Sequence, residues 1–366
     1  MRQATPVLTY DEQVILALRD LYGAYGYSPF RMSRFEEYDL YVRNKAFLVS
    51  DSVITFTDTD GKLMALKPDV TLSIVKNCRP TAGAVEKLYY DENVFRVSQG
   101  THAFREIKQA GLECIGSLDT ASLSEVLRLA AESLAVIDEG YILDVSHLGV
   151  VEALLSELGV SEGGRADLLS ALGSKNPHGA RAILADEGIS EEAAGRLLSL
   201  LSTSGAPGEA LPRLSTLLAG CPGAMAALDE LSAVLCGVGD LAGLRIDFSV
   251  IHDMQYYNGI VFRGFVPGVA AGILSGGEYD RLVQKLGRAE GAVGFAVYLD
   301  LLSGVKAAPR AADAEVFLLY GETDAACDVL AAADSLRRDG VRVRTGRAVP
   351  AGFSADRVVT LAEVKA

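Results

Sequence analysis

Apolar side chains recur with a helical period near the start of the chain. One face of residues 10–25 carries Val14, Leu18, Leu21, Tyr22 and Tyr25. Gly26 follows this run, and glycine commonly ends a helix because it adopts a left-handed backbone conformation without a steric penalty. The pattern predicts an amphipathic helix over residues 10–25.

The following segments alternate between apolar and polar residues. Asp58–Gly61 (DTDG) separates a strand-like run at Ser52–Phe56 from another at Leu63–Leu66, which is typical of a β-hairpin. Further strand-like runs surround a polar loop at Ser98–His102; they cover Lys87–Tyr90, Val94–Val97 and Ala110–Gly116.

A leucine- and alanine-rich helix is expected over residues 120–138, and the composition then changes. From Gly149 to about Leu235 aromatic residues are absent, and short helical patterns are separated by Gly and Pro. Strand-like runs return at Leu244–Val250, Gly259–Phe265 and Gly291–Val297. We interpret residues of about 150–236 as a helical insertion within a sheet domain that spans residues 1–305.

The chain ends in a short βαβ-like tail, which we assign to residues 313–366. Its expected elements are strands at Glu315–Tyr320, Val341–Arg344 and Val358–Leu361 and a helix at Ala325–Arg338. The tail alone suggests an α/β fold, but it is too short to decide the class. Long hairpin strands with interspersed helices predict an α+β protein built on an antiparallel sheet, with a small C-terminal α/β segment.

Composition limits the possible functions of these 366 residues. Hydrophobic residues make up 49% and charged residues 22%, which is typical of a globular protein, and no apolar run is long enough to cross a membrane. The net charge of −14 repels polyphosphates at long range and makes tRNA an unlikely partner. The N-terminus has no apolar signal segment, and five scattered cysteines predict reduced, cytoplasmic thiols. Four dispersed histidines predict no metal site.

Gly237–Ala242 fits the glycine pattern of dinucleotide-binding loops. Such a loop needs a helix to begin there, so that its N-terminus can face the pyrophosphate. Here the glycines lead into the strand-like run at Leu244–Val250, so a turn is expected.

One strand pattern suggests an amino-acid pocket. Gln109, Gly111 and Glu113 share one strand face, because side chains repeat every second residue. Arg96 could bind a carboxylate, while Glu113 and Asp69 could accept ammonium or imidazole N–H groups. On spacing alone, a solvated sheet face with ordinary salt bridges is the favoured alternative.

Four segments, taken in order, resemble the hallmark motifs of histidyl-tRNA synthetase and its paralogues: AFLVSDSVITFTDTDGKLMALKPDVT, VFRVSQGTHAFREIKQAGLECIG, YYNGIVF and GILSGGEYDRLVQKLG. The resemblance covers roughly residues 8–305. It implies a class II aminoacyl-tRNA synthetase fold that forms a homodimer through its first motif.

The resemblance also implies which residues hold histidine. Asp69 and Thr71 match positions that contact its amino group. Arg96, Gln109 and Glu113 match second-motif positions around the amino acid. Tyr256, Tyr257 and Tyr279 match the histidine-specific motifs. Without the resemblance, Tyr256 and Tyr257 could be core aromatics, and Asp69 could cap a helix that starts at Val70.

Departures from the synthetase pattern affect ATP and tRNA functions. His252 replaces an arginine that stabilises negative charge during adenylate formation, and loss of such a contact costs about 10²–10³ in rate. Ser98 stands about where a glutamate would hold ATP. Lys67 replaces a customary arginine, and Ser33 replaces a proline of the first motif. The tail is shorter than the family's anticodon-binding domain and resembles a remnant of it.

Those departures, with Phe262–Gly268 and Gly272–Gly277, resemble the paralogous regulatory subunits of ATP phosphoribosyltransferase. The resemblance implies no catalysis and no cofactor, a short catalytic chain as partner in a hetero-oligomer (a hetero-octamer in the family), and L-histidine as effector of the first step of histidine biosynthesis. A divergent histidyl-tRNA synthetase and a binding module for another ligand remain alternatives. The regulatory site could also lie at the subunit interface.

Two further groups have simple interpretations. His102, in a polar loop, is expected to be solvated. The arginines near the C-terminus could meet an acidic partner, but a solvated helix end and an exposed strand are favoured; they are Arg337, Arg338, Arg342, Arg344 and Arg347.

Overall fold

The computed structural model describes residues 8–44, 53–81, 83–98, 101–251, 256–304, 314–338 and 340–365. The chain divides into two compact units: Asp11–Val305 forms the larger one, and Lys306–Ala366 with Met1–Tyr10 forms the smaller one. Within the described ranges, every helix is too short or too polar to span a membrane.

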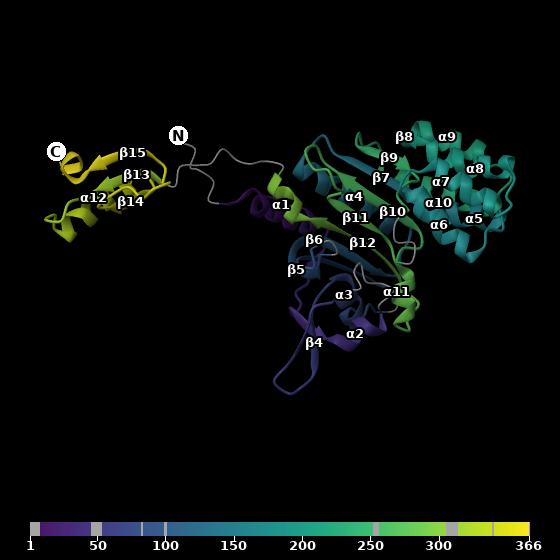
Figure 1. Cartoon of the computed structure of the whole chain (residues 1–366), viewed down its shortest axis with the longest axis horizontal. Coiled ribbons are helices and arrows are strands. Elements are labelled where there is room, and N and C mark those ends of the chain that lie inside the picture. Colours follow the sequence, from purple (N-terminus) through teal and green to yellow (C-terminus); the bar gives the residue numbers. More distant parts are fainter. Residues whose placement is uncertain are drawn as a thin grey trace. The chain divides into compact units, whose positions relative to one another are not determined.

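A nine-stranded sheet forms the centre of the larger unit, in the order β1-β5-β6-β12-β11-β10-β7-β9-β8 (Figure 1). All neighbours from β5 to β7 pair antiparallel, while β1 with β5 and β7 with β9 pair parallel. The predicted α+β class with an antiparallel sheet is therefore confirmed. The strands are β1 Ser28–Pro29, β5 Val85–Val97, β6 Phe104–Gly116, β7 Ile142–His147, β8 Ser204–Gly205, β9 Leu244–Asp247, β10 Ile260–Phe265, β11 Leu274–Glu278 and β12 Gly291–Tyr298.

β5 and β6 form one long hairpin, paired from Val85 opposite Gly116 to Val97 opposite Phe104. The sequence predicted two short strands in place of β5, because polar residues at positions 91–93 interrupt its apolar pattern. Those residues stay in the strand because they have partners. Asp91 accepts two hydrogen bonds from the Arg19 guanidinium, and Glu92 pairs with Lys67.

Helices α1 (Tyr10–Ala24) and α4 (Thr120–Ile137) pack together against the sheet. The predicted N-terminal helix is confirmed, and Gly26 beyond it has a φ of 81°. Asp119 caps α4 by accepting a hydrogen bond from the Ser122 backbone N–H. The Tyr22 hydroxyl of α1 lies 3.0 Å from the Ser133 hydroxyl of α4, so a buried polar contact joins the two helices.

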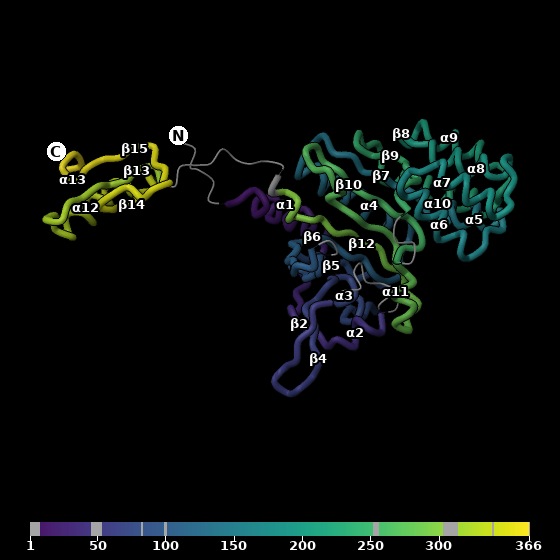
Figure 2. Tube along the Cα trace, viewed as in Figure 1, coloured from purple at the N-terminus to yellow at the C-terminus, as the bar shows by residue number. Residues whose placement is uncertain are grey.

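Between β7 and β9 the chain passes through a group of helices, and only the two-residue strand β8 among them joins the edge of the sheet (Figure 2). Ser161, Asn176 and Ser190 cap three of these helices, and proline begins three of them. Gly237 and Val238 end α10, and Gly239–Ala242 lead from that helix toward β9. No helix begins at these glycines, so the predicted turn is confirmed for Gly239–Ala242. The helices are α5 Leu148–Glu157, α6 Glu162–Gly173, α7 Pro177–Asp186, α8 Glu191–Ser202, α9 Pro207–Leu218 and α10 Pro222–Val238.

A three-stranded sheet contains the predicted hairpin. Its strands are β2 (Phe35–Glu37), β3 (Thr55–Thr57) and β4 (Leu63–Leu66), with β4 in the middle. Gly61 in the turn has a φ of 81°, which suits glycine. The expected start of the first strand at Ser52 lies outside the described residues. Nearby helices are α2 Tyr38–Arg43, α3 Thr71–Asn77 and α11 Asp280–Lys285.

The smaller unit has the predicted βαβ pattern. Strands β13 (Ala314–Leu319), β14 (Val343–Gly346) and β15 (Ala355–Thr360) form a parallel sheet with β13 in the middle. Helix α12 (Ala326–Arg338) packs on it, joined by a last helix, α13 (Leu361–Lys365), that the sequence did not indicate.

Candidate functional site

The predicted pocket residues lie around Glu113 of β6, which is only 1% exposed. The space for its side chain comes from Gly294 of β12, which pairs with Glu113 across the sheet. A Cβ atom on Gly294 would overlap Glu113 Oε2 and would lie 2.5 Å from the Leu112 carbonyl oxygen. A glycine opposite a buried carboxylate therefore makes this site possible.

Glu113 is held by two hydroxyl groups. Thr71 Oγ1, at the start of α3, donates to Oε1 at 2.6 Å, and the Tyr279 hydroxyl donates to Oε2. Burial raises the pKa of Glu113 to about 8, the two hydroxyl hydrogen bonds oppose this rise, and the nearby charge of Asp69 adds to it. The carboxyl group is thus buried without a cationic partner among the described residues.

Asp69 and Arg96 form the neighbouring part of the site. Asp69 Oδ1 accepts a hydrogen bond from the Leu72 backbone N–H at 2.9 Å, so Asp69 does bond to the first turn of α3. The helix begins at Thr71, with Val70 as its N-cap residue, and not at Val70 as expected. Burial raises the pKa of Asp69, while the Leu72 hydrogen bond and the charge of Arg96 lower it. Arg96 Nε donates to the Pro68 carbonyl oxygen at 3.0 Å. A solvated face with ordinary salt bridges is not what this arrangement shows.

Gln109 lies on the same sheet face as Arg96 and Glu113, as the register of β5 and β6 requires. Its side chain is 3% exposed, and its cross-strand partners are Glu92 of β5 and Tyr298 of β12. A side-chain amide has both a donor and an acceptor, so Gln109 carries the kinds of group that an amino-acid ligand could contact.

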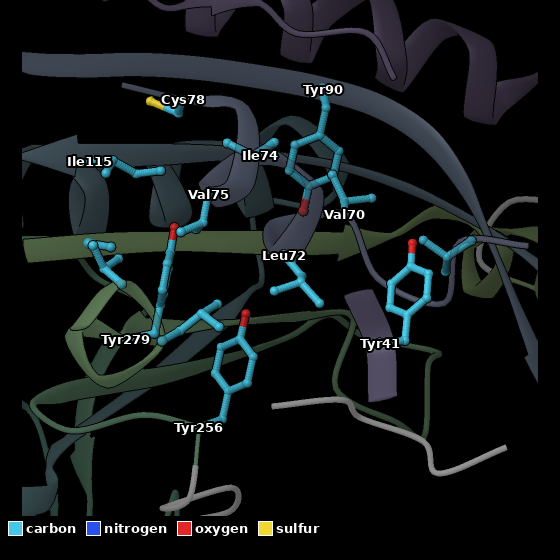
Figure 3. Packing of buried hydrophobic residues seen from close by; sticks show 14 of the residues in the cluster. Tyr41, Val70, Leu72, Ile74, Val75, Cys78, Tyr90, Ile115, Tyr256 and Tyr279 are labelled. Atoms are coloured by element: carbon cyan, nitrogen blue, oxygen red, sulfur yellow. The ribbon is translucent and has the colours of Figure 1, made fainter. Parts of the chain in front are cut away.

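Several tyrosine rings lie close together near Glu113, and Figure 3 shows Tyr90, Tyr256 and Tyr279 among the buried residues there. The rings of Tyr256 and Tyr257 lie 4.7 Å apart, and those of Tyr256 and Tyr279 lie 5.8 Å apart. Burial raises the pKa of Tyr256, and a hydrogen bond with Thr71 opposes that rise. In Figure 3, Tyr256 and Tyr279 point toward α3 from one side and Tyr90 points toward it from the other.

Tyr90 is a site residue that sequence reasoning missed. It is fully buried. Burial is the main cause that raises the pKa of the Tyr90 hydroxyl, and the nearby charge of Glu113 raises this pKa further. The feature that could have identified Tyr90 is its position on β5. Tyr90 lies two residues from Leu88, and these two residues pair with Gly111 and Glu113 on one sheet face. A Cβ atom on Gly111 would lie 2.7 Å from the Tyr90 hydroxyl, so this glycine makes room for the ring.

Arg288 joins two segments of the site. Its Nη1 donates to the carbonyl oxygens of Val75 at 2.9 Å and Cys78 at 2.7 Å, where α3 ends. Arg288 itself follows α11, and Tyr279 directly precedes that helix. The sequence did not single out this arginine.

Several departures from the synthetase pattern can be located. Lys67 is 0% exposed, and its Nζ lies 2.6 Å from Glu92 Oε2 in an ion pair. Ser33 is exposed and accepts a hydrogen bond from the Phe35 backbone N–H. Ser98 bonds through its backbone to Ala103 and His102. His102 is exposed, as predicted. His252 lies outside the described residues.

One group of ligand-type side chains resembles a metal site. His147, Glu230 and Glu278, from β7, α10 and β11, have ligand atoms within 4.8 Å of one another. His147 Nδ1 accepts a hydrogen bond from the Gly149 backbone N–H at 3.1 Å and caps α5. The neutral ring then carries its proton on Nε2, which faces Glu230 at 3.3 Å. Neither ring nitrogen has a lone pair to offer, so a helix cap explains this group better than a metal.

The C-terminal arginines have local partners. Arg337 pairs with Asp334, Arg347 pairs with Glu322, and the guanidinium of Arg344 lies over the Phe353 ring. These contacts fit a solvated surface.

The order and pairing of the central sheet define a class II aminoacyl-tRNA synthetase-like protein. The family model described as "Histidyl-tRNA synthetase" matches residues 7–302. A structure from Bacillus halodurans, an ATP phosphoribosyltransferase regulatory subunit/histidyl-tRNA synthetase, covers 98% of this chain and 96% of its own, with 24% identity and a TM-score of 0.77; it shows the fold.

Relatives found by sequence similarity point to one branch of this wider family. The ATP phosphoribosyltransferase regulatory subunit of Symbiobacterium thermophilum is 33% identical over 80% of this chain and 75% of its own length. That of Moorella thermoacetica is 33% identical over 89% of this chain and 85% of its own. The chain belongs to the ATP phosphoribosyltransferase regulatory subunit family, within the wider histidyl-tRNA synthetase family.

Proposed function

We propose that this chain is a regulatory subunit that assembles with a separate catalytic chain of ATP phosphoribosyltransferase, makes that chain active, and renders it sensitive to L-histidine. Family membership supports this function, since relatives that share a third of their residues over most of both chains carry this name. The expected partner is the short form of the catalytic chain, which binds ATP and phosphoribosyl pyrophosphate. A homodimer within a hetero-octamer is the assembly that we propose.

The proposed histidine site contains Asp69, Thr71, Arg96, Gln109, Glu113, Tyr256, Tyr257 and Tyr279. The single observation that best supports a ligand here is the buried carboxyl group of Glu113, which has hydroxyl partners but no cationic partner among the described residues. Arg96 suits a ligand carboxylate, and the carboxyl groups of Asp69 and Glu113 suit positively charged or N–H groups.

The chain is proposed to be non-catalytic. His252 stands where the synthetases place an arginine, and a neutral imidazole would stabilise a developing phosphate charge poorly. The smaller unit is proposed to be a truncated relative of the anticodon-binding domain, and α5–α10 are proposed to be an insertion. Histidine would act by favouring one state of the complex, which needs a coupling of about 1–3 kcal/mol between ligand and partner.

The decisive experiment co-purifies the chain with a short ATP phosphoribosyltransferase chain and measures activity with and without histidine. Glu113→Ala and Arg96→Ala should weaken inhibition by histidine while assembly stays intact. Glu106→Ala is the matched control, because Glu106 is exposed on the opposite face of β6. Unchanged inhibition in both pocket variants would move the sensor to the subunit interface, and failure to co-purify would contradict the regulatory function.

A divergent histidyl-tRNA synthetase is the second candidate, supported by the family model and the retained pocket. The chain alone, mixed with histidine, ATP and labelled pyrophosphate, should show no exchange. Exchange at a synthetase-like rate would favour this second candidate.

A further inference from the structure

The protein's own groups do not balance the charges around Glu113. Asp69 has the positive charge of Arg96 beside it, and Lys67 is paired with Glu92. Glu113 has only the hydroxyl groups of Thr71 and Tyr279, and no lysine or arginine nitrogen from the described residues lies within ion-pair distance of it. A buried carboxylate in such a place is strongly disfavoured unless it is protonated or meets a cation.

The hydroxyl groups allow Glu113 to hold a proton. A threonine hydroxyl can donate or accept, so Thr71 can receive a hydrogen bond from a protonated carboxyl group as well as give one to a carboxylate. Thr71 also hydrogen-bonds to Tyr256, so its own proton has a second acceptor. Burial raises the pKa of Glu113 to about 8, which fits a carboxyl group that keeps its proton at neutral pH when no cation is near.

An amino-acid ligand brings two backbone charges, and these cancel. Its carboxylate suits Arg96 and its ammonium suits Asp69. The charge of Glu113 can then be balanced only by the ligand's side chain. Tyr90, Tyr256 and Tyr279 lie near Glu113, and aromatic rings attract a planar cation.

We propose that the pocket binds its ligand as a side-chain cation, with the proton supplied by Glu113. For histidine, one proton moves from a carboxyl oxygen of Glu113 to a ring nitrogen, so the bound pair is a carboxylate and an imidazolium. No proton leaves for the solvent. This inference rests on the proposed histidine site and adds the ionic form that the site selects. A ring of the same shape that is a much weaker base is rejected.

The test uses the full-length chain and L-histidine labelled with ¹⁵N in the ring, at pH 8, where free imidazole is neutral. ¹⁵N NMR of the bound ligand should show both ring nitrogens protonated. In Glu113→Gln the bound ring should be neutral, and affinity should fall by about 10–100-fold. Glu106→Gln, on the opposite face of β6, is the matched control and should behave as the unaltered chain.

A second measurement compares histidine with 1,2,4-triazole-3-alanine, whose ring is a far weaker base. The unaltered chain should prefer histidine by at least about 10-fold, and Glu113→Gln should lose most of this preference. A bound but neutral ring, or equal affinity for both ligands, overturns the inference and leaves the histidine site standing. Absence of any bound histidine overturns both.

Discussion

Glu113 and Glu278 are two buried glutamates on β6 and β11, the two strands that flank β12, but their surroundings differ. Glu278 accepts a hydrogen bond from the Ile260 backbone N–H at 2.5 Å and lies beside His147, which caps a helix. Among the described residues, Glu113 receives its hydrogen bonds from the hydroxyl groups of Thr71 and Tyr279 and has no cationic partner. A buried carboxyl group that accepts a hydrogen bond from the backbone supports the fold. A buried carboxyl group that is held only by side-chain hydroxyl groups is better explained as part of the proposed ligand site.

The largest expected effect that separates the two is on stability at alkaline pH. A carboxyl group whose folded pKa is raised stabilises the fold fully below its unfolded pKa near 4.5, and this contribution is lost as pH rises through the folded pKa. That value is about 8 for Glu113 and about 7 for Glu278. Glu113→Gln should therefore match the unaltered chain near pH 4.5 and exceed its free energy of unfolding at pH 8 by on the order of a few kcal/mol.

Urea denaturation at pH 4.5 and pH 8 measures this effect, with the exposed Glu106→Gln as control. Glu278→Gln should show a smaller gain, because its folded pKa is lower. Parallel stability profiles for Glu113→Gln and the control would show that Glu113 is ionised in the folded chain.

The next largest effect comes from the glycines that make room for each carboxyl group. Gly294→Ala would overlap Glu113 Oε2 and crowd the backbone at Leu112, and Gly259→Ala would overlap only Glu278. Overpacking should lower the free energy of unfolding by about 1–3 kcal/mol, more for Gly294→Ala because backbone must shift. Calorimetric titration should show weaker histidine binding for Gly294→Ala alone. Weakened binding in Gly259→Ala as well would remove the functional distinction between the two acids.

A smaller effect is expected at His147. His147→Ala removes the cap of α5 and should cost about 1 kcal/mol of unfolding free energy, and His147→Asn should restore most of it. Thermal unfolding of the two variants checks this. If Asn is as damaging as Ala, the ring contributes more than its capping nitrogen.

The smallest effect is expected from metal. Zinc that bound only the folded chain would raise the melting temperature. We expect no change, because both ring nitrogens of His147 are already engaged in hydrogen bonds with Gly149 and Glu230. A melting temperature that rises with zinc and returns after chelation would contradict the assignment of this group as a helix cap.

The sequence predicted what depends on local pattern. The helix before Gly26, the hairpin around Asp58–Gly61 and the βαβ tail all follow from periodicity and turn residues. β11 was not predicted, because glycines are rare in strands. Gly276 and Gly277 occur in β11 because a Cβ atom at either position would crowd Phe262, Phe295 or Ile260. Only the folded sheet brings these residues close to the two glycines.

For the site, the residue types and the order of the motifs indicated which residues take part, but not which side chains are buried or paired. Nothing in the sequence shows that Gln109 and Glu113 are buried or that Lys67 is fully buried against Glu92. Tyr90 was missed because its closeness to Glu113 depends on the register between β5 and β6. Such facts require long-range pairing.

Arg288 has a consequence for how the pocket can change shape. Its guanidinium ties the end of α3 to the segment after α11, and the starts of these same two helices carry Thr71 and Tyr279. The distance between the two hydroxyl groups that hydrogen-bond to Glu113 therefore depends on the Arg288 hydrogen bonds at the other end of both helices. A conformational change that starts at this site must move α3 and α11 together, since movement of one helix alone would break those hydrogen bonds.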